Sequence, residues 1–308
     1  MEKILIFGVS GFAGRYLAKE LVESGYTVYG TDLAKNPALP REVEFIKSDV
    51  MKADEVEKVV LSVNPDAVVN LAAVNSVGDS WNNLMRTISV NVSGALNILE
   101  AVRKCEPIPK ILFIGSSEEY ESTSDNITED MKLNSNNPYG VSTITQDYLM
   151  EIYKEHYKME CYYVRPFNQL GVGQKTNSAL PSFCHQVAEI EKSGKPGVVE
   201  VGNLDVERDY TDIRDIVRAY RLILEGENSA TIYNIGSGRT YTMRELLEYI
   251  ISLSSQEIEI KVNPELVRPV DSQRICCDYS KIKNELGWSP EYDIKDTLVE
   301  MYEDYLMN

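Results

Sequence analysis

Three glycines near the start of the chain have the spacing of a phosphate-binding turn. Gly8, Gly11 and Gly14 form a GxxGxxG pattern that follows the apolar run 4–7 and opens a helical pattern. In such a turn the glycines let backbone N–H groups approach a pyrophosphate, and the positive end of the helix dipole favours its charge. The pattern predicts a dinucleotide site, with an ordinary strand-to-helix turn as the alternative.

Two aspartates stand after the next two expected strands. Asp32 lies 24 residues after Gly8, where a carboxylate accepts hydrogen bonds from the ribose hydroxyls of adenosine and repels a 2′-phosphate. This predicts NAD rather than NADP, although aspartate at a strand end is also a common turn-former. Asp49 is placed either to meet the adenine edge or to cap a helix.

These residues need a parallel sheet to position them, and the apolar pattern predicts one. Short β-rich runs alternate with amphipathic segments of a dozen residues or more, which is typical of βαβ units. The expected strands are 4–7, 27–31, 44–47, 67–71, 110–114 and 161–164. The expected helices are 15–24, 86–105 and 138–157, the last with proline in its permitted first turn.

After Pro166 the elements are less regularly spaced, so a second, smaller lobe is expected there. The pattern predicts helices at 182–192 and 212–225 and strands at 198–201 and 232–235. Thr242 and Glu245 have the spacing of a capping box that opens one more helix.

Composition excludes several classes of protein. The 308 residues are 43% hydrophobic and 26% charged, which is ordinary for a globular chain of this length. The net charge of −17 disfavours nucleic acid and anionic membrane surfaces as partners. No apolar stretch reaches the ~18–20 residues of a membrane helix, so a cytoplasmic protein is expected. Five cysteines without CxxC spacing and two distant histidines predict reduced, buried thiols and no metal.

A hydroxyl pair stands after the fifth expected strand and at the start of helix 138–157. Ser116 follows Gly115, and Tyr139 opens the sequence Tyr-Gly-Val-Ser-Thr. With these motifs the chain resembles the extended short-chain dehydrogenase/reductase superfamily, whose members carry a catalytic Ser or Thr after this strand and then YxxxK. Within it, the chain resembles most the GDP-mannose 4,6-dehydratases and GDP-4-keto-6-deoxymannose reductases. The segments that carry this likeness are 115–120, 165–168, 201–212, 233–238 and 268–271.

The resemblance implies an α/β fold with a Rossmann-type, doubly wound parallel sheet. It places the NAD-binding domain at 1–165, with return segments near 209–236, and a smaller nucleotide-sugar-binding lobe at 166–308. It also implies a homodimer or a dimer of dimers, built through the helices that begin near Arg86 and Pro138. The cofactor-binding residues expected from the pattern and the resemblance are Gly8, Gly11, Phe12, Ala13, Gly14, Asp32, Leu33, Asp49, Val50, Leu71, Ala72, Ala73 and Tyr139.

The resemblance also implies catalytic roles. Ser116 would hydrogen-bond the sugar C4 oxygen, and Tyr139 would exchange the proton on that oxygen. Glu118 falls where the dehydratases place a carboxylate for C5 deprotonation, with an ordinary solvated glutamate as the alternative. The expected catalytic set is Ser116, Glu118, Tyr139 and Thr143, and the expected substrate-binding set is Ser76, Asn168, Asn203, Arg208, Arg268 and Asp271.

Two residues depart from the family pattern. Asp32 is the first, because the nearest relatives commonly use NADP and lack an acidic residue there. Thr143 is the second, since it replaces the lysine that holds the nicotinamide ribose and lowers the tyrosine pKa. Without a cation, a tyrosine with a pKa near ~10 is a poor base at neutral pH.

The sequence therefore predicts an NAD(H)-dependent oxidoreductase acting at C4 of a nucleotide-linked sugar, a GDP-hexose or GDP-heptose. A 4,6-dehydratase and a C4 epimerase are alternatives with related chemistry. A non-catalytic protein that binds NAD or a nucleotide sugar is the alternative of another class, and Thr143 motivates it.

Overall fold

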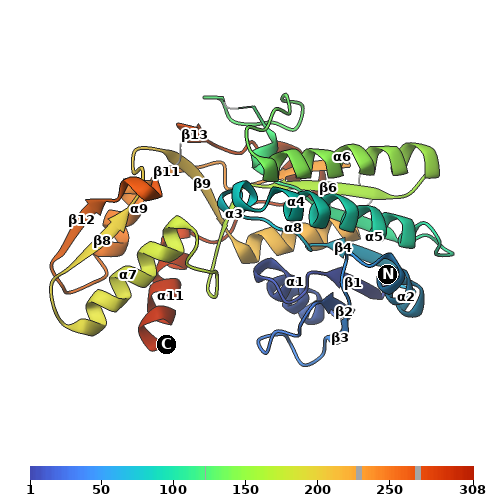
Figure 1. The fold of residues 1–308 in the computed structure, drawn as a ribbon, viewed down its shortest axis with the longest axis horizontal. Coiled ribbons are helices and arrows are strands. Elements are labelled where there is room, and N and C mark those ends of the chain that lie inside the picture. The colour runs from blue at the N-terminus through green and yellow to red at the C-terminus, as the bar shows by residue number, and fades with distance from the viewer. Residues whose placement is uncertain (122, 227–230, 268–271) are drawn as a thin grey trace.

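Parallel strands form a seven-stranded sheet in the order β10-β6-β5-β4-β1-β2-β3 (Figure 1). The computed structural model describes residues 1–121, 123–226, 231–267 and 272–308. The strands of this sheet are β1 (Lys3–Phe7), β2 (Thr27–Asp32), β3 (Glu44–Lys47), β4 (Ala67–Asn70), β5 (Lys110–Ile114), β6 (Cys161–Pro166) and β10 (Ile232–Ile235). The strands predicted up to residue 164 are confirmed to within two residues at each end.

Helices cover both faces of the sheet, which explains why its strands are apolar on both sides. Ile4 and Ile6 of β1 are buried in one core, and Leu5 and Phe7 are buried in the other. The helices α1 (Phe12–Glu23) and α8 (Ile213–Glu225) pack in the first core, and α2 (Ala53–Val63), α5 (Gly94–Val102) and α6 (Pro138–Tyr157) pack in the second. This is a doubly wound α/β fold of the Rossmann type.

The order of the strands reverses between β1 and β4. The chain runs outward from β1 through β2 to β3 and then returns to β4 on the other side of β1. At such a reversal the loops after the two central strands diverge, and ligands bind beyond the carboxyl ends of the strands. The glycine-rich turn follows β1 at this edge, and Leu71 follows β4.

The prediction of one regular helix at 86–105 is wrong. The structure has α4 (Leu84–Ile88), a π-helical turn at Ser89–Ser93, and then α5. Asn91 in that turn is fully buried, and its amide group bonds the Ser142 hydroxyl at 2.8 Å and the backbone N–H of Val74 at 2.8 Å. A buried amide needs such hydrogen-bond partners. The spacing of apolar residues does not predict them.

A smaller part of the molecule has its own core (Figure 1). Its elements are α7 (Ala179–Ser193), α9 (Met243–Ile251), α11 (Ile294–Met307) and the strand pair β8 (Gly197–Val201) and β12 (Ile258–Val262). The Thr242–Glu245 capping box is confirmed at the start of α9. The division at residue 165 stays a prediction, and the later elements α8 and β10 pack with the large sheet.

Short strands connect these two parts. They are β7 (Asn168–Leu170), β9 (Glu207–Asp212), β11 (Thr240–Thr242) and β13 (Arg274–Ile275), and β9 pairs with the other three. Two short helices, α3 (Val77–Asn82) and α10 (Ser280–Leu286), complete the elements used below. The five cysteines are buried and free, as predicted. Within the described ranges, no helix is long and apolar enough to cross a membrane.

Candidate active site

The glycine-rich turn after β1 packs tightly against the backbone of the neighbouring loop. Gly8 has φ of +80°, and a Cβ there would lie 2.7 Å from the backbone nitrogen of Ala72. A Cβ on Gly14 would lie 2.3 Å from the Gly8 carbonyl oxygen. Glycine is therefore required at both positions. Gly11 precedes α1 and has no side chain to cap it, so the first-turn N–H groups suit a phosphate.

Asp32 lies at the end of β2 beside this turn. Its carboxylate accepts hydrogen bonds from the backbone N–H of Leu33 at 2.7 Å and of Ser10 at 3.2 Å. The Ser10 hydroxyl donates to the Ala34 carbonyl oxygen at 2.7 Å, so the two loops are tied together. The carboxylate is thus held next to the turn, and the residues present fit a dinucleotide with free ribose hydroxyls.

Asp49 has a local structural role. Its carboxylate accepts a hydrogen bond from the backbone N–H of Met51 at 3.0 Å, within the turn that precedes α2. The helix-capping alternative is wrong, because Lys52 is the N-cap residue of α2 and no side chain caps this helix. The neighbouring Val50 packs over Gly94 of α5 and accepts a hydrogen bond from Asn97 through its carbonyl oxygen. Contacts of these residues with a cofactor stay predictions, as do those of Phe12, Ala13, Leu33, Leu71, Ala72 and Ala73.

Ser116 and Tyr139 are brought together at the carboxyl edge of the sheet. Ser116 follows the end of β5 and is 8% exposed, and Tyr139 lies in the first turn of α6 and is 9% exposed. The Ser116 hydroxyl hydrogen-bonds the Tyr139 hydroxyl. The helix start is fixed because the Asn137 side chain accepts a hydrogen bond from the Gly140 N–H at 2.9 Å. Two segments distant in sequence thus meet to form a hydroxyl pair.

The electrostatic surroundings of Tyr139 are acidic. Burial raises its pKa well above the usual value, and the carboxylates of Glu119 and Glu118 raise it further, while the hydrogen bond from Ser116 lowers it. Thr143 is buried, and its hydroxyl donates to the Gly140 carbonyl oxygen at 3.0 Å. The threonine is therefore bonded to its own helix, and it supplies no positive charge to the tyrosine.

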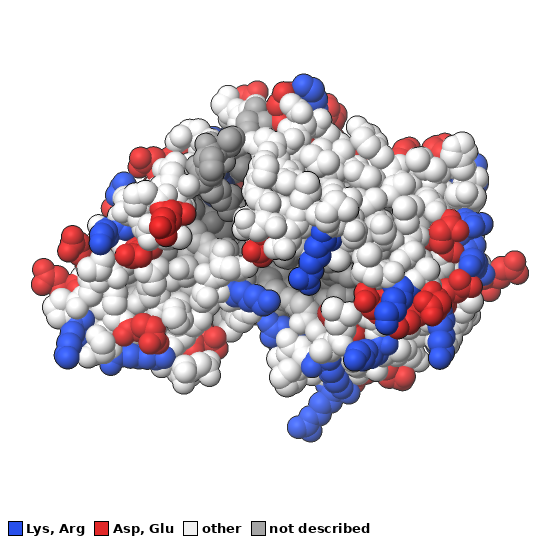
Figure 2. Space-filling model, in the orientation of Figure 1, with Lys and Arg blue, Asp and Glu red and all other residues white. Residues whose placement is uncertain are grey.

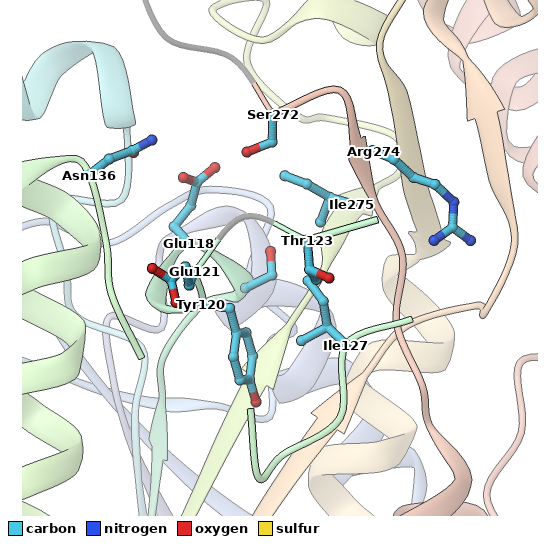
Figure 3. Close-up of a pocket in the computed structure, with 10 residues that line it drawn as sticks. Glu118, Tyr120, Glu121, Thr123, Ile127, Asn136, Ser272, Arg274 and Ile275 are labelled. Atoms are coloured by element: carbon cyan, nitrogen blue, oxygen red, sulfur yellow. The ribbon is translucent and has the colours of Figure 1, made fainter. Parts of the chain in front are cut away.

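Glu118 borders a small, open cavity (Figure 3). Asn136, Ser272 and Arg274 also line this cavity, and the Asn137 amide donates to Glu118 at 2.8 Å. A carboxylate therefore faces this cavity, two residues from Ser116.

Two predicted substrate-binding residues lie where short connections pack together. The Asn168 amide donates to the Asp209 carbonyl oxygen at 3.0 Å. Arg208 is 7% exposed and donates to the carbonyl oxygen of Ser272 at 2.7 Å, which places it next to the cavity wall. Their contacts with a substrate stay predictions.

Ser76 and Asn203 have local partners, since Ser76 caps α3 and Asn203 accepts a hydrogen bond from the Asp205 N–H. Substrate contacts of both stay predictions. Arg268 and Asp271 lie outside the described residues.

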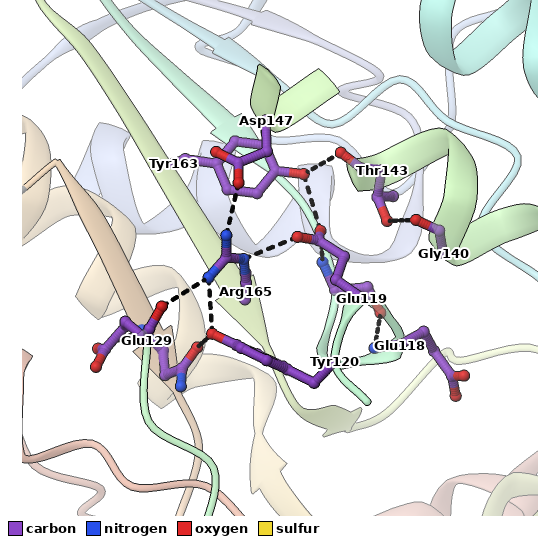
Figure 4. Close-up of polar contacts among 11 residues, drawn as sticks. Glu118, Glu119, Tyr120, Glu129, Gly140, Thr143, Asp147, Tyr163 and Arg165 are labelled. Carbon is purple, nitrogen blue, oxygen red and sulfur yellow. Dashed lines mark hydrogen bonds and ion pairs between the residues drawn. The ribbon is translucent and has the colours of Figure 1, made fainter. Parts of the chain in front are cut away.

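A buried ion cluster beneath Ser116 was not predicted (Figure 4). Glu119 is fully buried, and Arg165 is 2% exposed. Both lie in motifs that carry the family resemblance, but neither was assigned a role. The available signal was Arg165 itself, because an arginine inside the apolar run of β6 requires buried carboxylates around it.

The fold and the hydroxyl pair define an extended short-chain dehydrogenase/reductase. The sequence profile of the family described as GDP-mannose 4,6 dehydratase matches residues 5–301, and the chain belongs to this family. Its relatives are nucleotide-sugar-modifying, NAD(P)-dependent enzymes.

Individual relatives include both reductases and epimerases. The chain is 28% identical to a GDP-6-deoxy-D-mannose reductase from Pseudomonas aeruginosa, covering 99% of this chain and 97% of that one. The structure of RMD from Pseudomonas aeruginosa complexed with NADPH superposes with a TM-score of 0.85 at 26% identity, covering 100% of this chain and 99% of that one. A UDP-glucose 4-epimerase from Thermotoga maritima with UDP-glucose gives a TM-score of 0.88 at 25% identity, with 98% of each chain covered.

Proposed function

We propose that this protein is an NAD(H)-dependent oxidoreductase that acts at C4 of a GDP-linked hexose or heptose. The observation that carries the proposal is the Ser116–Tyr139 hydroxyl pair, which lies at the same sheet edge as the glycine-rich turn. A reductase at 28% identity over nearly the whole chain supports the choice of a GDP sugar.

The roles proposed for the residues come from the family resemblance, and their positions in the structure support them. The Ser116 hydroxyl orients the C4 oxygen of the sugar, and Tyr139 exchanges the proton on that oxygen. The glycine-rich turn and Asp32 would hold the dinucleotide, whose nicotinamide exchanges hydride with C4. Arg208 is placed near the cavity, where its guanidinium suits a diphosphate. In Figure 2, basic side chains border the hollow between the two parts, although the chain as a whole is acidic.

A 4,6-dehydratase is the second candidate, and Glu118 is the observation that favours it. Its carboxylate lines the cavity and is close enough to Tyr139 to raise the pKa of that hydroxyl, and the family resemblance assigns a base for C5 to this position. A non-catalytic binder is the third candidate, because Thr143 supplies no charge that would ease the ionisation of Tyr139.

One experiment separates these candidates by the mass of the product. The protein is incubated with GDP-mannose and NAD⁺, and separately with a GDP-4-keto-6-deoxy sugar and NADH. A gain of two hydrogens by the keto sugar, or a loss of two by GDP-mannose, supports the oxidoreductase. Loss of water from GDP-mannose supports the dehydratase. An unchanged mass in both mixtures, with both ligands bound in calorimetry, leaves the binder and a C4 epimerase, and the proton NMR spectrum of the recovered sugar separates these two.

We expect NADH to bind at least about tenfold more tightly than NADPH, a difference of about 1.4 kcal/mol. The reason is that the Asp32 carboxylate, held by two backbone N–H groups, accepts ribose hydroxyls and repels a 2′-phosphate. Calorimetric titration measures both affinities, and Asp32→Ala should narrow the ratio. Equal affinities of the parent protein for NADH and NADPH would contradict a selective role of Asp32. One solved relative was solved with NADPH, so both cofactors must be compared.

Thr143→Lys should shift the pH profile of sugar oxidation toward lower pH. Oxidation requires ionised Tyr139, so its rate in the parent should rise toward alkaline pH. A lysine one helical turn away stabilises the phenolate and should lower the kinetic pKa by about one unit or more. Initial rates between pH 6 and 11 measure the shift. An unchanged profile in a folded variant that binds NADH normally would contradict the role of charge at position 143.

We further propose that the protein dimerises through α6 and α4. Val141, Tyr148 and Ile152 lie on one side of α6 and are 47%, 63% and 48% exposed, and Met85 of α4 is 78% exposed. Apolar side chains gathered on one helix face are typical of an interface. Tyr148→Glu should convert the dimer mass to the monomer mass in light scattering, and Val262→Glu should not. A parent that is monomeric at micromolar concentration would rule this out.

A further inference from the structure

Glu119 contacts both Arg165 and Tyr163 in the buried cluster (Figure 4). One carboxylate oxygen accepts the backbone N–H of Ser116 at 2.9 Å, and the other accepts Arg165 Nε at 2.8 Å. The residue forms a capping box with Ser116, so its side chain determines how the chain leaves β5. The side chain of Glu119 thus holds the backbone of a proposed reacting residue.

The same cluster holds the helix that carries Tyr139. Arg165 Nη2 bonds Asp147 of α6 at 2.6 Å, and the Tyr163 hydroxyl lies 2.8 Å from the carbonyl oxygen of Thr143. That hydroxyl also lies 2.9 Å from Glu119. Glu119, Arg165 and Tyr163 therefore connect the Ser116 loop to the N-terminal half of α6 through hydrogen bonds and ion pairs.

Gly115 leaves room for the contact between Glu119 and Tyr163, because it has no side chain. A Cβ on Gly115 would lie 2.2 Å from the Glu119 carboxylate and 2.3 Å from the Tyr163 hydroxyl oxygen. Any side chain at this position would displace both groups. Gly115 therefore allows the carboxylate and the phenol to meet directly behind the reacting pair.

We propose that Glu119, held by Arg165, is a positioning residue that sets Ser116 against Tyr139 and places a negative charge behind the tyrosine. This rests on the proposed function, because it takes Ser116 and Tyr139 as the reacting pair. Glu119 does not touch the substrate and acts only through these two residues.

The charges of the cluster agree with this assignment. Two carboxylates, Glu119 and Asp147, share one guanidinium, and burial raises the pKa of Glu119 to about 7. The Tyr163 hydroxyl has one proton for two acceptors, so both of its contacts are satisfied when Glu119 is protonated. Above pH 7 Glu119 is ionised, and its charge opposes ionisation of Tyr139. The other groups acting on Tyr139 are Glu118 and Ser116.

The test uses the full chain labelled with tyrosine carrying ¹³C at Cζ. The Tyr139 resonance is assigned by its loss in Tyr139→Phe, and its chemical shift reports both ionisation and the hydrogen bond from Ser116. Glu119→Gln should move this resonance at pH 8 and lower the pH at which it begins to titrate by about one unit or more. Where turnover is measurable, kcat should fall about 10–100-fold with an unchanged KM for NADH.

Asp215→Asn is the matched control. Asp215 is fully buried, pairs with Arg218 at 2.7 Å and accepts two backbone N–H groups, but it lies on α8 away from the hydroxyl pair. The Asp215→Asn variant should lower the midpoint of thermal unfolding, as Glu119→Gln does. It should leave the chemical shift of the Tyr139 resonance unchanged. If Glu119→Gln does not fold, Glu119→Met combined with Arg165→Met and Asp147→Leu removes all three charges together, a change that buried ion clusters often tolerate.

An unmoved Tyr139 resonance in either folded Glu119 variant overturns the positioning role. A resonance that moves equally in Asp215→Asn also overturns it, because the effect would then be one of general destabilisation. Turnover in Tyr139→Phe at the parent rate would instead refute the proposed function, since the resonance measurement needs no substrate.

Discussion

Tyr139→Phe should reduce turnover of the GDP sugar by about 10²–10⁴-fold, the range of a positioned acid or base. The phenol is buried and hydrogen-bonded to Ser116, so water has little access to replace its proton. NADH affinity should change by less than about threefold, because the ring and the fold remain. Steady-state kinetics with calorimetry on the same preparation measures both quantities.

Two further variants make this result interpretable. Ser116→Ala should lower kcat in the same direction, since the C4 oxygen and the phenol would both lose one hydrogen bond. Tyr157→Phe changes a half-exposed tyrosine at the far end of α6 and should leave kcat at the parent value. Near-parent turnover in Tyr139→Phe would mean that another group moves the proton, and the family mechanism would not apply to this chain.

Arg165→Met should lower the free energy of unfolding by about 3–5 kcal/mol at pH 8, the cost of leaving buried charges without their partner. Arg165 is the cation that neutralises both Glu119 and Asp147, and its Nη1 also bonds the Tyr120 hydroxyl at 2.8 Å. Removing it leaves two carboxylates in a low-dielectric interior. Urea unfolding followed by circular dichroism measures the loss.

The free energy of unfolding lost in Arg165→Met should be smaller at pH 5.5 than at pH 8. Burial already raises the pKa of Glu119 and Asp147 in the parent, and without Arg165 both values rise further. A group whose folded pKa is raised favours the folded state below its unfolded pKa, and this contribution is lost as pH rises through the folded value. Arg218→Met provides the comparison, because its side chain is 20% exposed and its loss should cost less. A pH-independent loss would show that packing, not charge, dominates at Arg165.

Cofactor choice is also expected to distinguish this chain from a solved relative. The Pseudomonas aeruginosa protein RMD was solved with NADPH, whereas the carboxylate of Asp32 stands beside the glycine-rich turn here. The Ser10 hydroxyl bonds the loop that follows β2. Asp32 and this loop connection together argue for NAD, and the titration proposed above decides between the cofactors.

The sequence by itself determined the features that depend on local patterns. Strands buried on both faces read as apolar runs, so the six strands up to residue 164 were predicted. Helix α6 was predicted over its full length, because proline stands in its first turn and the helical pattern continues to Tyr157. The glycine spacing identified the turn after β1, since a positive φ and close backbone contacts leave no other choice at Gly8. Motifs then identified Ser116 and Tyr139 as candidates.

Only the tertiary structure decided how those candidates are held. Glu119 and Arg165 are 46 residues apart, and no local period indicates that they meet. The same holds for Asn91, whose side chain bonds Ser142, 51 residues further along the chain. Asn91 lies in the π-helical turn that interrupts a predicted helix. The physical reason is that a buried charge or amide is stabilised by partners from other strands and helices. Propensity and periodicity describe one segment at a time, so these partnerships appear only when the segments pack.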